Sequence, residues 1–213
     1  MAKSAFRTGI MFLMLIAASA GYAWAYDDVV TLWSEAKTPA PPELAEVTVI
    51  PADTAFFILD IEELTCNKDR RPRCLETVPR IAKFLQRARA AGMPVAYSLT
   101  TRGTADTILE EVKPSGGETI VNASVNKFYG TTLDEFLTKN GIKQVIVCGT
   151  AAHGAVMHTA TAIGQRKLKL ILPVDGLSAA DLYTEQAAVQ LLKTGPGTRR
   201  NIAITRFDMI RIK

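Results

Sequence analysis

Several polar side chains that could carry out acid–base chemistry stand at the ends of apolar segments of the sequence. Asp60 ends the run TAFFILD, Asn122 follows ETIV, and Asp175 ends KLILPVD. A carboxylic acid such as Asp60 can donate a proton to a substrate if its pKa is raised toward neutrality. The turn GTAAHGA (149–155) follows another apolar run but contains neither Ser nor Cys. Nucleophilic catalysis by a serine or cysteine of this turn is therefore excluded.

A second carboxylate accompanies Asp60. Glu62 lies two residues further on, hence on the same side if the strand continues. Like charges in one site raise the pKa of a carboxyl group, because ionising one disfavours ionising the other. We therefore expect Asp60 to be a proton donor and Glu62 to lie in the same substrate-binding site. The alternative is that Asp60 only caps a neighbouring loop or helix.

The elements that must position these residues alternate along the chain. Apolar runs typical of buried parallel strands cover residues 54–60, 93–99, 118–121, 143–149, 169–175 and 201–207. The segments between them predict helices over residues 75–92, 131–141, 154–167 and 181–195. This alternation predicts an α/β fold, a single-domain, three-layer, Rossmann-like parallel sheet with helices on both faces. Ligands bind beyond the carboxyl ends of the strands in such sheets, where the polar residues stand.

The N-terminal segment predicts export. A short basic stretch, MAKSAFR, precedes the apolar run IMFLMLIAASAG and the small-x-small pattern AWA. That apolar run is short for a membrane span, which needs about 20 residues. We therefore expect residues 1–25 to be a cleaved signal peptide and the protein to be periplasmic or extracellular. The alternative is an uncleaved membrane anchor. The proline-bearing residues 26–51 are predicted to be a surface linker, and 52–213 the folded domain.

Export permits disulfides, which changes the interpretation of the three cysteines. Cys66 and Cys74 flank the short loop NKDRRPR and are predicted to form a disulfide. Cys148 ends an apolar run and is expected to be a buried, unreactive thiol. The cysteine spacing is not that of a zinc site and the chain has only two histidines, so we expect neither a metal nor another cofactor.

Composition limits the classes of partner. Lys and Arg number 25 against 21 Asp and Glu, a net charge of +4 that is too small to indicate a nucleic-acid partner. The basic cluster RRPR (70–73) is interpreted as a solvated loop. We expect a small-molecule ligand, and contact with a membrane only if the signal stays uncleaved.

From about Ala52 to Ile204 the chain resembles the isochorismatase-like hydrolases, a cysteine hydrolase superfamily that includes nicotinamidases. Five segments carry the resemblance in order: FFILD, RARAAGMPVAYS, GTTLDEFL, VIVCGTAAHGAVMHTATA and LPVDG. The resemblance implies a working set of Asp, Lys and Cys, with Asp60 as the acid. The position of the family's cysteine falls on Ala155. Thiol-dependent hydrolysis is therefore not expected, because that chemistry requires a thiolate.

The family's lysine can be placed in two ways. An ungapped count back from GTTLDEFL places it on Asn122, which donates hydrogen bonds but carries no positive charge. Lys127 takes the role only if the segment between it and GTTLDEFL is shorter here than in the family. We favour Asn122. Without the lysine Asp60 would be a better acid, because an adjacent cation lowers the pKa of a carboxyl group.

The turn at 149–155 is also similar to that of the isochorismatases proper, which have a small residue in place of the cysteine. Their turn has the form G-x-x-A-H-x-G, and GTAAHGA matches it in the Ala152-His153 pair and in Ala155. The resemblance then implies cleavage of an enol-ether bond, with Asp60 as general acid and water attacking without a covalent intermediate.

Other residues of the predicted site lie around this turn. His153, Gly154 and Tyr129 are expected to contact the substrate, although His153 could instead cap a helix or face solvent and Tyr129 could be a packing aromatic. Backbone N–H groups at the helix start could bind a carboxylate. The resemblance gives Asp175 a structural role.

Two functions remain open at this point. The first is an exported hydrolase that acts on a small molecule through Asp60 and a bound water. The second is an inactive pseudoenzyme that binds a small carboxylate ligand or a protein partner. Members of the family commonly form oligomers, so the resemblance also implies a homo-oligomer.

Overall fold

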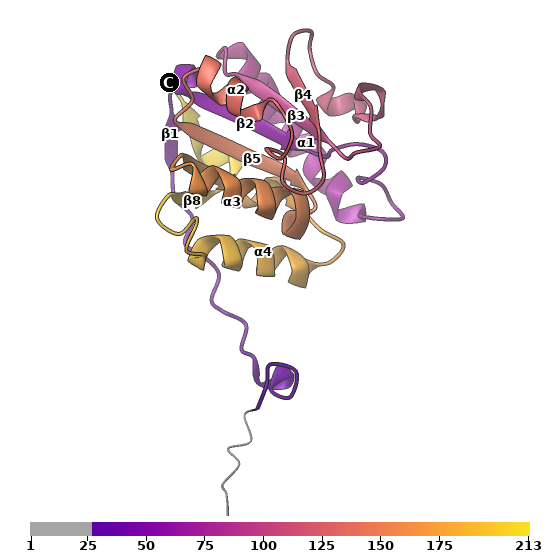
Figure 1. Cartoon of the computed structure of the whole chain (residues 1–213), viewed down its shortest axis with the longest axis vertical. Coiled ribbons are helices and arrows are strands. Elements are labelled where there is room, and N and C mark those ends of the chain that lie inside the picture. The colour runs from indigo at the N-terminus through magenta and orange to yellow at the C-terminus, as the bar shows by residue number, and fades with distance from the viewer. Residues whose placement is uncertain (1–26) are drawn as a thin grey trace, which may run out of the picture. The chain divides into compact units, whose positions relative to one another are not determined.

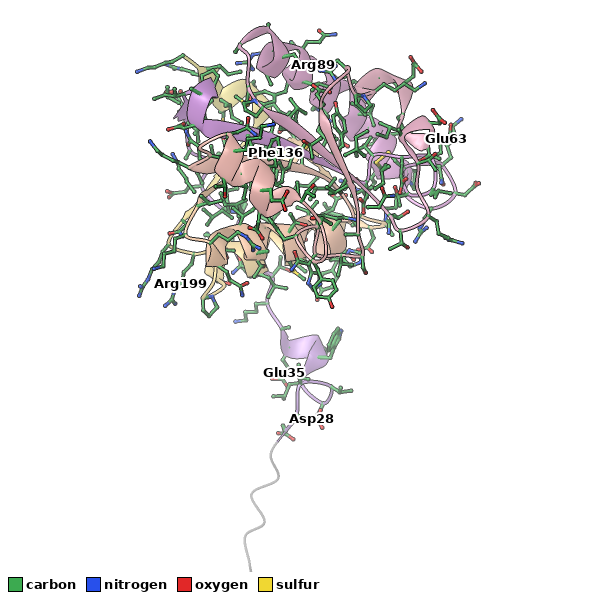
Figure 2. All side chains as sticks on the ribbon, turned by 45° about the horizontal axis from the view of Figure 1, so that its top comes forward. Asp28, Glu35, Glu63, Arg89, Phe136 and Arg199 are labelled. Carbon is green, nitrogen blue, oxygen red and sulfur yellow. A yellow bond between two sulfur atoms is a disulfide. The ribbon has the colours of Figure 1, made fainter. Side chains whose placement is uncertain are left out.

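The computed structural model describes residues 27–213, so the predicted signal peptide lies outside the described residues. The chain forms two compact units, and the boundary between them in the sequence lies between Thr38 and Pro39. In the first unit, residues 27–38 are exposed and contain the short 3-10 helix η1 (Trp33–Glu35). The Asp28 carboxylate accepts hydrogen bonds from two backbone N–H groups just before this helix; Asp28 and Glu35 are labelled in Figure 2. No helix within residues 27–213 is both long enough and apolar enough to cross a membrane.

The second unit is built on a seven-stranded sheet whose strands pair in parallel. Its main path has the order β4-β3-β2-β5-β6-β8, and the short β7 also pairs with β5. Figure 1 labels β2, β3, β4, β5 and β8 of this sheet. The strands are β2 (Thr54–Leu59), β3 (Val95–Leu99), β4 (Thr119–Asn122), β5 (Gln144–Thr150), β6 (Lys169–Pro173), β7 (Leu177–Ser178) and β8 (Ile202–Thr205). All six predicted strands are confirmed.

Four α-helices cover both faces of this sheet. They are α1 (Pro72–Ala90), α2 (Leu133–Lys139), α3 (Met157–Gln165) and α4 (Leu182–Thr194). Successive side chains of a strand point to opposite faces. On β2, Phe56 and Ile58 therefore pack in the cluster that contains α1, while Phe57 and Leu59 pack in the cluster that contains the other three helices. The predicted three-layer α/β fold is confirmed.

Aromatic side chains fill the space on each face. The Phe84 ring of α1 packs against Phe56 at 5.0 Å between ring centroids and against Phe207 at 4.9 Å. On the opposite face, Phe136 of α2, labelled in Figure 2, lies 5.9 Å from Phe57. Both layers are therefore anchored on the central strand β2, the strand that ends at Asp60.

The domain begins earlier than predicted. Strand β1 (Val47–Val49) pairs in parallel with β9 (Ile210–Ile212) to form a separate two-stranded sheet. Val47 and Val49 are buried in the cluster that contains α1. The prediction of a surface linker over 26–51 is therefore wrong for its last part. Three-residue strands are too short to produce a periodic pattern, which is why the sequence did not reveal them.

The predicted disulfide between Cys66 and Cys74 is present, and both residues are buried. It closes a short loop ahead of α1. Replacing both cysteines by alanine is expected to lower the free energy of unfolding by about 2–3 kcal/mol, because the unfolded chain gains freedom. Urea denaturation under non-reducing conditions measures this. Reductant should produce the same loss in the native protein and none in the variant; equal stability of the two proteins would contradict the prediction.

Candidate active site

Asp60 stands at the carboxyl end of the central strand in an unusual backbone conformation. Its φ is +53°, a left-handed value that is uncommon outside glycine but more accessible to Asp than to most residues. The Asp60 N–H donates to the carbonyl of Ser98, and its own carbonyl accepts from the Thr65 hydroxyl. The chain therefore leaves the strand at Asp60 through a turn that neighbouring residues hold in place.

The Asp60 carboxylate forms a buried ion pair with Lys127. Lys127 Nζ lies 2.8 Å from Asp60 Oδ1, and the two side chains are 1% and 7% exposed. Ser98 Oγ donates to the same carboxylate oxygen at 2.8 Å. Lys127 Nζ also donates to the carbonyls of Leu99, at 3.2 Å, and Ala123, at 2.9 Å. A buried ion pair is tolerated when its remaining donors are satisfied in this way.

The lysine of the site is therefore Lys127, and the preference for Asn122 is wrong. Asn122 is exposed, and its side chain donates to the carbonyls of Thr100 and Gly103 instead of approaching Asp60. The ungapped count failed because the loop after β4 carries Lys127 back against the sheet edge. The length of a loop produces no periodic pattern in a sequence. Only the folded chain therefore shows which residue occupies the position of the family's lysine.

Helix α3 fixes the Lys127 loop. The Lys127 N–H donates to Thr159 Oγ1 at 3.2 Å, and Thr159 Oγ1 donates to the carbonyl of Val125 at 3.3 Å. These two hydrogen bonds hold the Lys127 loop against α3.

Ala155 itself is buried, with 3% of its surface exposed. It lies in the π-helical turn η5 (Ala152–Val156) that leads into α3. Its apolar cluster includes Leu59 and Phe128, the sequence neighbours of Asp60 and Lys127. Asp60, Lys127 and Ala155 thus stand in segments that follow β2, β4 and β5 at the carboxyl edge of the sheet.

Gly149 allows the strand before this turn to approach β2 closely. Its φ is +130°, and a Cβ atom here would lie 2.1 Å from the carbonyl oxygen of Leu59. Only glycine fits such a contact. Cys148 packs in the cluster on the α1 face, opposite to that of Ala155, and burial raises the pKa of its thiol well above the ordinary value. The prediction of an inert, buried Cys148 is confirmed.

Burial raises the pKa of Asp60 above its ordinary value. The Lys127 ammonium and the hydrogen bonds from Lys127 and Ser98 oppose this rise, and the charge of Glu62 adds to it only weakly. The expected direction for Asp60 is therefore confirmed, although the main cause is desolvation and not the second carboxylate. A carboxyl group with a raised pKa is suited to proton donation.

Glu62 has a different role from the predicted substrate contact. It is fully buried, and its carboxylate accepts hydrogen bonds from the Thr100 N–H and from Thr107 Oγ1, both at 2.9 Å. A Cβ atom at Gly103 would lie 1.9 Å from Glu62 Oε2. Glu62 therefore holds the loop of residues 100–107, to which Asn122 also binds through Gly103.

The remaining predicted binding residues lie toward solvent. Tyr129 is 84% exposed, so its interpretation as a packing aromatic is wrong, and His153 is also exposed. Gly154 is half-buried beside Val125. Contact between substrate and these three residues stays a prediction. Asp175 accepts a hydrogen bond from the Phe207 N–H at 3.1 Å, which agrees with a structural role.

The sequence reasoning missed Ser98 and Thr159, which contact the ion pair and its loop. Both are polar residues at buried positions of an otherwise apolar strand or helix. Because a buried polar group needs a hydrogen-bond partner, a polar residue within such a segment could have indicated a contact with the site. Within residues 27–213, no three His, Cys, Asp or Glu side chains are grouped closely enough to hold a metal ion.

Comparison with known proteins identifies the family. The family model described as the isochorismatase domain matches residues 54–202. The chain belongs to the isochorismatase family. It is 32% identical over 165 residues to the secreted isochorismatase effector Isc1 of Verticillium dahliae, covering 72% of this chain and 84% of that protein. It is 28% identical over 128 residues to N-carbamoylsarcosine amidase of Arthrobacter sp., covering 46% and 48%.

Solved structures of the family share the fold. A cysteine hydrolase from Pseudomonas syringae pv. phaseolicola aligns with a TM-score of 0.68 and 20% identity over 79% of this chain and 95% of its own. N-carbamoylsarcosine amidase from Thermoplasma acidophilum aligns with a TM-score of 0.63 and 24% identity over 73% of this chain and 97% of its own. The hydrolase family and the architecture of the sheet are therefore established independently of any single motif.

Proposed function

We propose that this member of the isochorismatase family is an exported hydrolase that cleaves an enol ether in a small molecule through Asp60 and a bound water. The observation that carries the proposal is the buried Asp60–Lys127 pair at the carboxyl edge of the sheet. It combines a carboxyl group of raised pKa with a neighbouring cation, and residue 155, to which the resemblance assigns the family's thiol, is alanine. The match to a secreted relative supports export.

The chemistry balances without a covalent intermediate. Protonated Asp60 gives its proton to the terminal carbon of the enol ether, and the adjacent carbon becomes an oxocarbenium ion. A water molecule attacks that carbon and returns a proton to Asp60. In the resulting hemiketal the hydroxyl proton passes to the leaving oxygen as the carbon–oxygen bond breaks, so that one water and one enol ether yield a ketone and an alcohol.

Lys127 and Ser98 act on the charge that forms in the first step. When Asp60 loses its proton, the carboxylate gains both the ion pair with Lys127 Nζ and the hydrogen bond from Ser98 Oγ at full strength. Because these donors are already in place, little reorganisation accompanies proton transfer. The lysine that an isochorismatase-like site requires is present, which favours the enzyme over an inactive fold.

One observation favours the second candidate, a binding protein without turnover. Asp60 is only 5% exposed and Lys127 only 1%. In this conformation the pair is closed to a ligand, and turnover requires that surrounding residues open. If they do not open, a small carboxylate ligand would reach only the rim of the site.

Turnover assays on two panels distinguish the candidates. We expect hydrolysis of simple enol ethers, followed by the appearance of the ketone, and no hydrolysis of matched primary amides, because position 155 lacks a thiol. A cysteine-dependent family member assayed in parallel is the control for the amide panel. Amide hydrolysis without enol-ether hydrolysis would contradict the proposed mechanism, and inactivity on both panels with saturable ligand binding would support the binding protein.

A further inference from the structure

We propose that basic residues at the amino ends of β5, β6 and β8 form a surface that docks this protein on an anionic phospholipid membrane. This basic face consists of Lys143, Lys167, Lys169, Arg199 and Arg200. The three strands are parallel to β2, so the basic face lies at the edge of the sheet opposite to Asp60. Docking there does not depend on the proposed function, because it uses none of the residues around Asp60.

Main-chain hydrogen bonds bring three segments of the basic face together. The Lys169 N–H donates to the carbonyl of Lys143 at 3.0 Å, and the Leu170 N–H donates to the carbonyl of Asn201 at 2.8 Å. Neighbouring strands of a sheet are about 4.8 Å apart. Lys143, Lys169 and Arg200 therefore stand at three adjacent strand starts and form a row of cations along this edge.

The charges of the basic face are largely uncompensated. All five side chains are exposed. Among the ion pairs formed within residues 27–213, only Lys143 of this set has a partner, Asp53, at 3.7 Å. A helix C-terminus attracts cations only within its last turn, and none of the five residues lies in an α-helix. The chain as a whole has an excess of only four basic residues, so its positive charge is concentrated on this face.

Lys167 occupies a position at which glycine is preferred. It follows α3 with a left-handed φ of +62°, and its N–H donates to the carbonyl of Gly164 at 3.0 Å. The corresponding residues after α1 and α2 are Gly92, with a φ of +69°, and Gly141, with a φ of +61°. A side chain makes this conformation costly, so the lysine lowers the stability of the fold. Strain of this kind is typical of residues whose side chain has a function.

The turn that carries Arg199 and Arg200 is already ordered. The Arg199 N–H donates to the carbonyl of Gly195 at 2.9 Å. A Cβ atom at Gly164 of α3 would lie 2.3 Å from the carbonyl oxygen of Gly197, so the helix and the turn are in direct contact. Arg199 is labelled in Figure 2. Because the backbone is held in this way, contact with a membrane costs little ordering of the chain.

The basic face fits an extended anionic surface better than a single anion or a nucleic acid. Neither the hollow between α3 and α4 nor the one beside α2 is lined by any of its residues. Segments 141–143, 166–169 and 195–201 contain no aromatic residue on which a base could stack. Clusters of about four to eight Lys and Arg residues are typical of proteins that bind anionic lipid headgroups. A protein docked through this face would direct the Asp60 edge away from the membrane.

The test measures co-sedimentation of the full chain with lipid vesicles. Vesicles in which about a third of the phosphatidylcholine is replaced by phosphatidylglycerol are expected to bind the protein at least about tenfold more tightly than vesicles of phosphatidylcholine alone. The difference should disappear at about 1 M salt, which screens exposed charges. The neutral vesicles report any contribution from the apolar N-terminal run.

Three variants locate the surface. Arg199→Gln combined with Arg200→Gln should weaken binding to anionic vesicles by about 25-fold, because each basic residue near such a surface contributes about fivefold. Arg70→Gln combined with Arg102→Gln is the matched control, which removes the same charge from exposed positions at the carboxyl edge and should leave binding unchanged. Lys167→Gly should weaken binding by about fivefold and, by relieving the left-handed lysine, raise the Tm by about 1–3 °C.

Three results would overturn the inference: equal binding to both kinds of vesicle, unchanged anionic binding in the Arg199/Arg200 variant, or an equal loss in the control. Binding of heparin, a soluble polyanion, without binding of anionic vesicles would overturn the membrane as the partner. A lower Tm for Lys167→Gly would remove the argument from strain. Turnover of a soluble enol ether should be the same in all these variants, so the hydrolase proposal stands or fails separately.

Discussion

Replacing Asp60 by asparagine is expected to lower kcat for enol-ether hydrolysis by about 10²–10⁴-fold, the contribution typical of a general acid. Asparagine preserves the size of the side chain and can still accept the hydrogen bond from Ser98 Oγ, but it has no carboxyl proton to donate. Steady-state kinetics on the enol ether hydrolysed fastest by the native protein measures the effect. Binding of a non-reacting ligand should survive, because the loss lies in proton transfer.

Asp175→Asn is the matched control for this substitution. Asp175 also stands just beyond a strand end and is partly buried, and burial raises the pKa of its carboxyl group. Its side chain accepts a hydrogen bond from the Phe207 N–H, which an asparagine oxygen also accepts. Turnover in this variant should stay near the native rate. Unchanged turnover in Asp60→Asn, or equal losses in the two variants, would remove Asp60 from the mechanism.

Replacing Lys127 by methionine is expected to lower the free energy of unfolding by about 3–5 kcal/mol near neutral pH, because it leaves a buried carboxylate without its cation. Methionine retains the length and apolar stem of the side chain, so the loss reports the charge more than the packing. Urea denaturation at several pH values, compared with the native protein, measures the change.

The same substitution has a defined dependence on pH. Lys127 lowers the pKa of Asp60, so its removal raises that pKa further above the unfolded value. The folded variant then binds a proton that the unfolded chain releases, and its stability declines as the pH rises above the ordinary pKa of Asp. The loss should therefore be smaller at acidic pH than at pH 8. Any residual turnover should persist to higher pH than in the native protein, because Asp60 remains protonated for longer.

Lys143→Met provides the control for Lys127→Met. Lys143 Nζ lies 3.7 Å from Asp53 Oδ2, but the lysine side chain is 80% exposed. An exposed pair of this kind contributes about 0–1 kcal/mol. Equal losses in the two variants, or a loss for Lys127→Met that does not vary with pH, would show that the Asp60–Lys127 pair does not control the charge of the site.

The layout of the sheet could be predicted because its signals are local. The apolar run at 54–60 forms β2, and its alternating side chains supply both faces of the core. The position of Asp60 follows from the same run, since a polar residue that ends a central parallel strand lies at the edge where ligands bind. Strands β1 and β9 were not predicted, because each is only three residues long and pairs with a strand from the other end of the domain.

The residue pattern alone was enough to predict the α/β class, the six main strands and the Cys66–Cys74 pairing, and it shows an aspartate at position 60 and no thiol at position 155. Each of these depends on residue type or on spacing within a short segment. Two features became visible only in the folded chain: Lys127, and not Asn122, pairs with Asp60, and Glu62 holds a loop. These contacts depend on how the loops after the strands fold over the edge of the sheet, and neither the length nor the path of a loop can be read from the residue pattern. Such contacts between distant segments are set by the packing of the whole domain.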